Sequence, residues 1–583
     1  MTEKHGSARY FVLAIMLSLA MTGLAVRLVF LHLGAGEQSR SMSSKTRTYK
    51  ETLAVPRGRI LDGGPSANIL AANVGAKDVW ADPSVLIASN KVGVVASQVA
   101  AVLGLNPTET ATLMNQERRR FVYLARYVPD EQADAVARLK LPGIHLSDTT
   151  TRSYPQGEML CHILGFVNHD GVGSWGIEQC MDKYLKGTPG LLESQLDGRR
   201  REMLDRRIQE IQPRDGADVV LTIDQNLQYM LEKSIDAAME KHRAKAASAI
   251  IQRVRTGEIL AMVNRPGFNP NDFRSATDEQ KLNRAIGYVY EPGSTFKVAV
   301  IAAALNEGIV TPTTMFNTEN GRWLYQKKVL RDYHPYSQLN VADIIKKSSN
   351  IGAAKIAIML GDERLDRYLR GFNIGSRLGI DLPGEEGGIL APASKWSSIS
   401  SSRIAIGQGV AVTPLQMLGI MCGIANDGIM MRPYVIKEVV SPNGTVLVRH
   451  EPQALGRCIR SDTAAVMREI LAHVTEPGGT GTKAAVEGFK VAGKTGTAQK
   501  PVKGHYSETD YMASFVGFMP ADDPEFGMIV VMDEPQPLHT GGIVSAPVFG
   551  EVAEQAARYL GLLPPGPAIE DRSAIASQAR VTP

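Results

Sequence analysis

EPGSTFKVAVIAAALNEG, at residues 291–308, is the most informative segment of the chain. Its Pro-Gly pair is a turn signal, and the apolar run behind it predicts a helix that begins at Ser294 and ends at Gly308. Ser294 and Lys297 are three residues apart, so they share one helix face. A lysine held among apolar neighbours has a lowered pKa and can remove the proton of a serine hydroxyl, while the helix N-terminus adds positive field. The spacing is common, but its place at the start of an apolar helix predicts a nucleophilic serine with a lysine base.

A second segment, IIKKSSNIGAAKIAIML at residues 344–360, predicts two helical runs that meet at Ser348, Ser349 and Asn350. Serine and asparagine side chains bond readily to nearby backbone groups, so they are frequent where helices break or begin. From spacing alone, an ordinary helix break or cap is the better interpretation of these three residues.

A third segment, VAGKTGTAQK at residues 491–500, overlaps a false phosphate-binding signal. Residues 488–495 read GFKVAGKT and fit the pattern G-x-x-x-x-G-K-[ST] letter for letter. That loop requires a helix starting at the lysine, but Gly496 and Pro501 follow it and oppose a helix. Small or apolar residues alternate with polar ones, so we predict a strand and reject the phosphate loop.

The N-terminal region predicts a membrane anchor. The run from Tyr10 to Val26 carries no charge, and the apolar pattern resumes after Arg27. A helix from Tyr10 to Leu31 is about 33 Å long, enough for a bilayer core of about 30 Å. The alternative is a cleaved signal peptide, but the run is long for one and no clean small-x-small site follows it. We expect a single-pass anchor at 10–33, with Arg27 near one end and able to reach the headgroups.

The composition is that of an ordinary globular protein. The 583 residues are 44% hydrophobic and 21% charged, which excludes a disordered or fibrous chain. The net charge of +4 and an aromatic content of 6% give no sign of nucleic-acid binding, and we expect none. The four cysteines have no metal-ligand spacing, so we expect no metal and no cofactor. Cys161 and Cys180 could pair in an oxidising compartment, which the sequence leaves open.

Three short motifs occur in the order typical of the penicillin-recognising serine enzymes: S-x-x-K at 294–297, S-x-N at 348–350 and K-T-G at 494–496. Further matching segments extend along nearly the whole chain: RGRILD (57–62), RSYP (152–155), GFVNHDGVGSWGIE (165–178), LTIDQNLQ (221–228), GQGVAVTPLQM (407–417) and YMASFVGFMP (511–520). The chain therefore resembles a class B penicillin-binding protein, a peptidoglycan D,D-transpeptidase. The S-S-N form of the second motif resembles the division-type (FtsI-like) members more than the elongation type.

The resemblance implies a role for each catalytic residue. Ser294 would be the nucleophile that attacks the penultimate D-Ala carbonyl of a stem pentapeptide, with Lys297 as its base. Ser348 would pass the proton to the leaving D-Ala, and Asn350 would hold the substrate amide. Lys494 would support the proton network.

The resemblance also implies how substrate is bound. Thr495 would help to hold the substrate carboxylate, and Gly496 and Thr497 belong to the same binding strand. The backbone N–H groups of Ser294 and Thr497 would form the oxyanion hole, whose donors are commonly worth about 3–4 kcal/mol of barrier. A β-lactam, which mimics the D-Ala-D-Ala end, would trap Ser294 as an acyl-enzyme.

The implied fold is an α/β (α+β) transpeptidase fold, with an antiparallel sheet flanked by helices on an elongated mixed pedestal. Strands at 514–520 and 526–533 would pair near the K-T-G strand. We expect six parts in chain order: a cytoplasmic tail (1–9), a transmembrane anchor (10–33), a juxtamembrane linker (34–50), a pedestal of the penicillin-binding-protein dimerisation type (51–215), a transpeptidase domain (216–561) and a disordered tail (562–583).

The family also suggests location and partners. The protein would sit in the inner (cytoplasmic) membrane with a periplasmic catalytic domain. It would bind the stem peptides of lipid II and peptidoglycan as well as β-lactams, and work in the divisome beside a SEDS-type glycosyltransferase. The alternatives are an elongation-type transpeptidase, a β-lactamase, a β-lactam sensor and an inactive divisome scaffold. A β-lactamase would need a deacylating base that we cannot assign, and a tail of about nine residues cannot supply a sensor's signalling domain.

Overall fold

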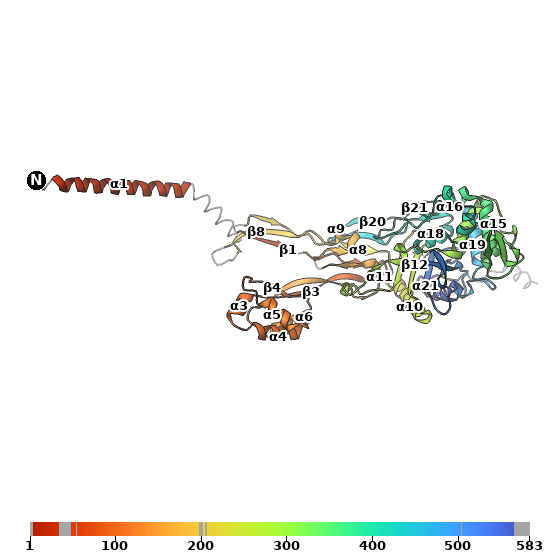
Figure 1. Ribbon diagram of the computed structural model, residues 1–583, viewed down its shortest axis with the longest axis horizontal. Helices are drawn as coiled ribbons and strands as arrows, with labels where there is room; N and C mark the ends of the chain where they lie inside the picture. Colours follow the sequence, from red (N-terminus) through yellow and green to blue (C-terminus); the bar gives the residue numbers. More distant parts are fainter. Residues whose placement is uncertain are drawn as a thin grey trace, which may run out of the picture. The chain divides into compact units, whose positions relative to one another are not determined.

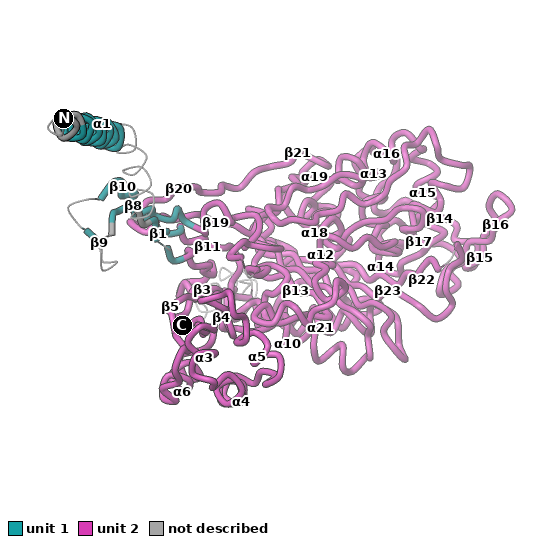
Figure 2. Tube along the Cα trace, turned by 60° about the vertical axis from the view of Figure 1, so that its left-hand side comes forward, with its two compact units in different colours: residues 1–56, 187–216 teal, residues 57–186, 217–583 magenta. Residues whose placement is uncertain are grey.

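The computed structural model describes residues 4–33, 48–53, 55–168, 170–196, 202–203, 207–502 and 504–564. These residues form two compact units, one of residues 1–56 with 187–216 and the other of residues 57–186 with 217–583 (Figure 2). The predicted linker up to residue 47 and the predicted tail from residue 565 onward lie outside the described residues.

The first unit contains helix α1 (Lys4–Leu33) and a small antiparallel sheet. Within α1, the segment Arg9–His32 contains an 18-residue window with a mean hydropathy of 2.2, and none of that window is buried in the protein, so this helix is a candidate membrane span. The sheet contains β1 (Thr48–Leu53), β8 (Gly190–Leu196), β9 (Glu202–Met203) and β10 (Gln209–Ile211). Strand β8 lies between β1 and β10.

The second unit is built around a five-stranded antiparallel sheet. In spatial order its strands are β13 (Ile259–Arg265), β12 (Ala246–Arg253), β24 (Phe526–Asp533), β23 (His505–Met519) and β22 (Ala492–Val502). The predicted pairing of 514–520 with 526–533 beside the K-T-G strand is confirmed. Strand β22 is the edge of this sheet, which accommodates Pro501 because an edge strand tolerates a missing N–H.

Helices cover both faces of this sheet (Figure 1): α10 (Gln225–His242), α21 (Ala546–Tyr559) and α18 (Pro414–Ala425). Met528 and Val530 of β24 join the core formed with α10 and α21, whereas Ile529 and Val531 join the core formed with α18. Successive strand residues point to opposite faces, so a strand buried on both sides is apolar throughout. The predicted fold class, an antiparallel sheet flanked by helices, is confirmed.

A second, seven-stranded sheet runs through the same unit. Its strands are β20 (Val446–Arg449), β19 (Ile436–Val440), β11 (Asp218–Leu221), β2 (Ile60–Leu61), β3 (Ile69–Ala81) and β4 (Val122–Val128), with β5 (Ile144–Ser153) also pairing with β3. Strand β11 pairs antiparallel with β19 and parallel with β2. One sheet therefore links the N-terminal part of this unit to strands from the C-terminal half of the chain.

Several short elements complete the second unit. Helices α3 (Pro83–Ala88), α4 (Val92–Leu103), α5 (Pro107–Met114) and α6 (Asp130–Arg138) accompany β3 and β4. Two-stranded pairs are β14 (Met315–Asn317) with β17 (Gln338–Asn340), β15 (Arg322–Tyr325) with β16 (Lys328–Arg331), β18 (Ile429–Met431) with β21 (Ala454–Arg457), and β6 (Phe166–Val167) with β7 (Gly173–Ser174).

A buried ion network joins three of the matching segments recognised in the sequence. Glu178 is fully buried; one carboxylate oxygen accepts from Arg57 Nε at 2.7 Å, and the other accepts from Arg152 Nε at 2.7 Å. A carboxylate between two arginines satisfies charges that would otherwise be costly to bury. Buried ion pairs therefore hold these three segments of the second unit together.

All four cysteines are free thiols, so Cys161 and Cys180 do not form the disulfide that the sequence left open. Burial raises the pKa of both thiols to about 12. Since the thiolate is the reactive form, neither cysteine is a nucleophile near neutral pH.

Candidate active site

Ser294 lies in a 3-10 turn, η3 (Gly293–Phe296), that leads into helix α13 (Lys297–Asn306). The sequence predicted an α-helix from Ser294, so the first turn is tighter than expected. With three residues per turn, residues i and i+3 eclipse each other, and Lys297 Nζ lies 3.0 Å from Ser294 Oγ. Gly293 has a φ of 59°, and a Cβ there would lie 2.9 Å from Ala498 Cβ, so β22 closely approaches this turn.

The Lys297 side chain is completely buried, and this burial lowers its pKa to about 7. Its Nζ also lies 2.6 Å from the Ser348 carbonyl oxygen and 2.7 Å from Asn350 Oδ1. The Asn350 amide is oriented by its Nδ2, which donates to the Arg331 carbonyl at 2.8 Å. A neutral amine has two N–H groups and one lone pair. The two obligate acceptors take the N–H groups, which leaves the lone pair for the hydroxyl of Ser294.

The S-x-N motif lies between helices α14 (Val341–Lys347) and α15 (Asn350–Leu360). Ser348 has a φ of 60° and ends α14, whereas Ser349 caps α15 by accepting from Gly352 N at 3.0 Å. The capping interpretation of this segment therefore holds for Ser349. The same sharp turn directs Ser348 and Asn350 toward Lys297, so the capped junction also serves the site.

Asp332 is a site residue that the sequence did not reveal. Its Oδ2 accepts from Ser349 Oγ at 2.6 Å, and its Oδ1 accepts from the backbone N of Asn350 at 2.5 Å and of Ile351 at 3.0 Å. The carboxylate therefore caps α15 and fixes the turn that holds the S-x-N motif. Asp332 belongs to no motif and lies outside the segment it supports, so only the fold identifies it.

Lys494 of β22 is also completely buried. Its Nζ lies 2.9 Å from Ser348 Oγ and 3.1 Å from the Thr495 carbonyl oxygen. Burial, together with the positive charge of Lys297, lowers the pKa of Lys494. Ser348 Oγ is also 3.1 Å from Lys297 Nζ, so this hydroxyl bridges the two lysines. The predicted catalytic residues thus form one connected cluster.

The remaining predicted site residues lie on β22 next to this cluster. Thr495 Oγ1 is 2.8 Å from Thr480 Oγ1, and Thr497 Oγ1 accepts from Gly541 N at 3.3 Å. The position of Gly496 is crowded, since a Cβ there would lie 2.3 Å from Ser514 Oγ. Strand β22 pairs with β23 alone among the described strands, so its other edge is available to an extended peptide.

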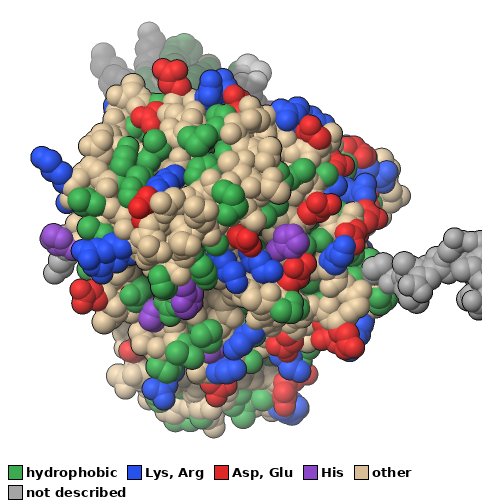
Figure 3. Space-filling view, turned by 90° about the vertical axis from the view of Figure 1, so that its right-hand side faces the viewer, with side chains coloured by type: hydrophobic (Ala, Val, Ile, Leu, Met, Phe, Trp, Pro, Cys, Tyr) green, Lys and Arg blue, Asp and Glu red, His purple; other side chains and the backbone are tan. Residues whose placement is uncertain are grey.

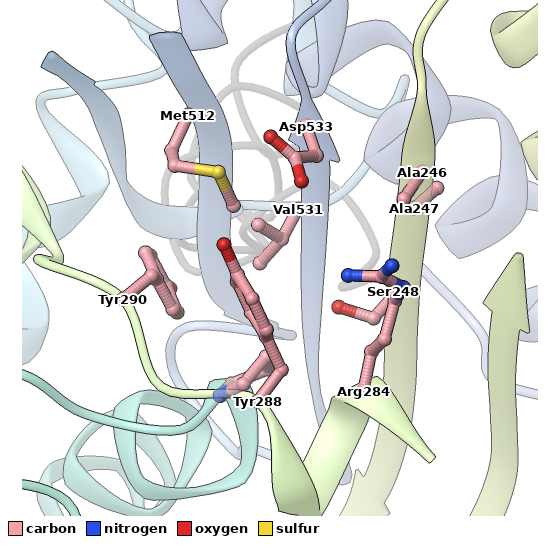
Figure 4. A pocket seen from close by; sticks show the side chains of 10 residues that line it. Ala246, Ala247, Ser248, Arg284, Tyr288, Tyr290, Met512, Val531 and Asp533 are labelled. Carbon is pink, nitrogen blue, oxygen red and sulfur yellow. The ribbon is translucent and has the colours of Figure 1, made fainter. Parts of the chain in front are cut away.

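A small pocket elsewhere in this unit does not belong to the cluster (Figure 4). It has a volume of about 10 Å³, enough for one water molecule, and Tyr288, Tyr290, Arg284 and Asp533 are among its lining residues. None of the predicted site residues lines it. The candidate active site is therefore the serine-lysine cluster beside β22.

Two protein families match this chain. The family described as "Penicillin binding protein transpeptidase domain" matches residues 247–554, and the one described as "Penicillin-binding Protein dimerisation domain" matches residues 52–221. The chain belongs to the penicillin-binding proteins. The sequence-based assignment to the class B, FtsI-like members is also confirmed, as the relatives below indicate.

This penicillin-binding protein is 34% identical over 573 residues to the peptidoglycan D,D-transpeptidase FtsI of Escherichia coli K12, covering 96% of this chain and 94% of that protein. It is 32% identical to stage V sporulation protein D of Bacillus subtilis, covering 92% and 83%. Its structure is similar to penicillin binding protein 3 from Mycobacterium tuberculosis complexed with aztreonam, with a TM-score of 0.69, 27% identity, and coverage of 89% and 98%.

Proposed function

We propose that this penicillin-binding protein is a peptidoglycan D,D-transpeptidase that acts through an acyl-enzyme on Ser294. The observation that carries the assignment of residues is the Lys297 amine, which is buried, bonded to two obligate acceptors and 3.0 Å from the Ser294 hydroxyl. A serine becomes nucleophilic when such a base removes its proton. The D,D-transpeptidase relatives and the matching transpeptidase domain support this reaction class.

In the first half-reaction the donor stem peptide lies along the free edge of β22, with its terminal carboxylate near Thr495 and Thr497. Ser294 Oγ attacks the penultimate D-Ala carbonyl and its proton moves to Lys297. The backbone N–H groups of Ser294 and Thr497 stabilise the oxyanion. The C–N bond to the terminal D-Ala then breaks, and Ser348, which bridges both lysines, delivers a proton to the leaving amine.

In the second half-reaction an amine of another stem peptide attacks the Ser294 ester. A new amide bond forms, the ester C–O bond breaks and the proton returns to the serine oxygen. Asn350 holds the donor amide in both steps. The result is a cross-link with release of one D-Ala.

The test is covalent labelling of the full-length protein in detergent with a fluorescent penicillin. We expect one stable label per chain, because the β-lactam reproduces the D-Ala-D-Ala end and no deacylating base is assigned. Ser294→Ala should abolish the label. Ser248→Ala, which removes a buried hydroxyl from β12 outside the cluster, is the matched control and should label normally.

Three outcomes would contradict the proposal. Rapid turnover of the penicillin by the native protein would favour a β-lactamase, and absence of label would favour an inactive scaffold. Labelling of Ser294→Ala would show that another residue is the nucleophile.

We infer that α1 anchors the protein in the cytoplasmic membrane with its catalytic unit outside the cytoplasm, and that it acts in cell division beside a SEDS-type glycosyltransferase. The length and hydropathy of α1 and the similarity to FtsI support this inference. Expression in cells depleted of their division transpeptidase should restore septation. Persistent filaments, with correction of round cells in an elongation-deficient strain, would instead favour an elongation role.

A further inference from the structure

The β15–β16 hairpin presents two different faces. Trp323 and Leu330 lie opposite each other and pack toward α15, contacting a core that includes Ile351. On the other face, Leu324 and Val329 lie opposite each other and are 68% and 40% exposed. A two-stranded hairpin is marginally stable without packing, so the inner face holds it in place and the outer face remains free.

The outer face also carries uncompensated positive charge. On this face Arg322 lies directly opposite Arg331, and Lys327 lies at the tip of the hairpin; none of the three forms an ion pair with another residue that the structure describes. Like charges directly opposite on neighbouring strands destabilise a hairpin. The nearby carboxylates are already engaged, since Glu319 pairs with Lys355 at 2.7 Å and Asp332 caps α15. An anion bound between the arginines would remove this repulsion.

The hairpin is also connected directly to the active site. The Arg331 carbonyl accepts from Asn350 Nδ2 at 2.8 Å, and the next residue, Asp332, holds the S-x-N turn. In Figure 2 the hairpin projects at the same end of the second unit as β22. The face in Figure 3 mixes basic, acidic and apolar side chains, so no broad field of one sign covers it and recognition there depends on local pairs.

We propose that the outer face of this hairpin binds the acceptor stem peptide, a short chain bearing free carboxylates. This rests on the proposed transpeptidase function, in which the donor lies between the edge of β22 and Asn350, so that the hairpin beyond Asn350 is left for the second substrate. Arg322 and Arg331 donate to an acceptor carboxylate, and Leu324 with Val329 contacts its apolar parts. The hairpin thereby raises the local concentration of the amine that must compete with water for the Ser294 ester.

The test measures three quantities with full-length protein in detergent: acylation by fluorescent penicillin, D-Ala release from a donor ending in D-Ala-D-Ala, and the ratio of transfer to hydrolysis with a carboxylate-bearing acceptor peptide. Arg322→Glu places a carboxylate opposite Arg331, which should keep or raise the melting temperature. We expect it to lower the transfer-to-hydrolysis ratio about threefold to tenfold. An acceptor whose carboxylates are amidated should give the native protein the same low ratio.

Lys437→Glu on β19 is the matched control, because Lys437 is exposed and the charge change is the same. It should leave all three quantities unchanged. An unchanged transfer ratio in Arg322→Glu would overturn the hairpin proposal, and so would a loss of D-Ala release with an unchanged ratio, since that pattern means donor binding. Failure of the native protein to be acylated or to release D-Ala would instead contradict the transpeptidase function itself.

Discussion

Lys297 can act as a base only while its amine is uncharged, so the pH dependence of acylation tests its role. Burial lowers its pKa to about 7, so the amine is mostly protonated at pH 6 and mostly neutral at pH 8. We expect the second-order rate constant of penicillin acylation to rise with pH, with a midpoint near 7, and then to level off. A stopped-flow series with the fluorescent penicillin measures this, and a profile that still rises steeply above pH 9 would contradict the assignment.

The same pKa shift makes a prediction about stability. The unfolded lysine has a pKa of 10.5 and the folded one about 7, so the unfolded state binds more protons between these values. The free energy of unfolding should therefore increase as pH rises through this window. Lys297→Met should remove this contribution, which comparison of urea unfolding of the two proteins at pH 7 and pH 9.5 would detect. Equal pH dependence in both proteins would show that Lys297 is charged in the fold.

Asp332 is expected to act as a positioning residue for the S-x-N turn. Asp332→Ala removes the acceptor for three donors, from Ser349, Asn350 and Ile351. We expect a stability loss of about 1–3 kcal/mol and an acylation rate at least about tenfold lower, since a misplaced turn moves Asn350 from Lys297. Asp332→Asn keeps one acceptor oxygen and should recover part of the rate. Normal acylation in Asp332→Ala would mean that the turn holds its shape without the carboxylate.

At the scale of elements, the site depends on how closely β22 approaches η3. Gly496 permits this approach, because a Cβ there would lie 2.3 Å from Ser514 Oγ and 2.9 Å from Thr295 Cγ2. Gly496→Ala should force the strand away from the turn, at a cost of about 1–3 kcal/mol, and lower acylation by about a hundredfold for a displacement near 1 Å. Gly371→Ala in α16 (Asp362–Gly371) is the control, because no atom lies within 4 Å of its added Cβ. Equal acylation rates in the two variants would show that this close approach is dispensable.

Local patterns in the sequence predicted the apolar N-terminal helix, the helix after Ser294 and the strand that carries K-T-G, because these depend on periodicity and on neighbouring residues. The tight 3-10 turn at Ser294 was not predicted; it packs against β22, about 200 residues away in the sequence, and no local spacing reveals that contact. Asp332 and the β15–β16 hairpin were not predicted either, because their roles depend on contacts with α15 that local spacing in the sequence does not reveal. The Ser349 cap, in contrast, was readable because a cap is a local interaction.

In the second unit as a whole, the seven-stranded sheet connects strands that lie far from the active site to the apolar core that packs beside the active-site turn. Strand β11 pairs with β2 on one side and β19 on the other, and its Val219 and Leu221 belong to the same apolar core as Phe296 of η3. A continuous sheet and a shared core favour cooperative unfolding. We therefore expect the second unit to melt in one transition, in which acylation capacity and secondary structure are lost together.

The buried Glu178 provides the sharpest test of this coupling. Glu178→Ala leaves the buried Arg57 and Arg152 without their shared carboxylate, which should cost about 3–5 kcal/mol. Acylation well below the melting temperature should be unchanged because Glu178 touches no residue of the serine-lysine cluster, but the temperature at which acylation is lost should fall together with the circular-dichroism transition. Asp148→Ala is the control, since Asp148 is 89% exposed and its pair with Lys77 contributes at most about 1 kcal/mol. If Glu178→Ala instead melts in two steps, with acylation surviving the first, strands β2, β3, β4 and β5 unfold independently of the catalytic sheet, and the seven-stranded sheet does not couple them.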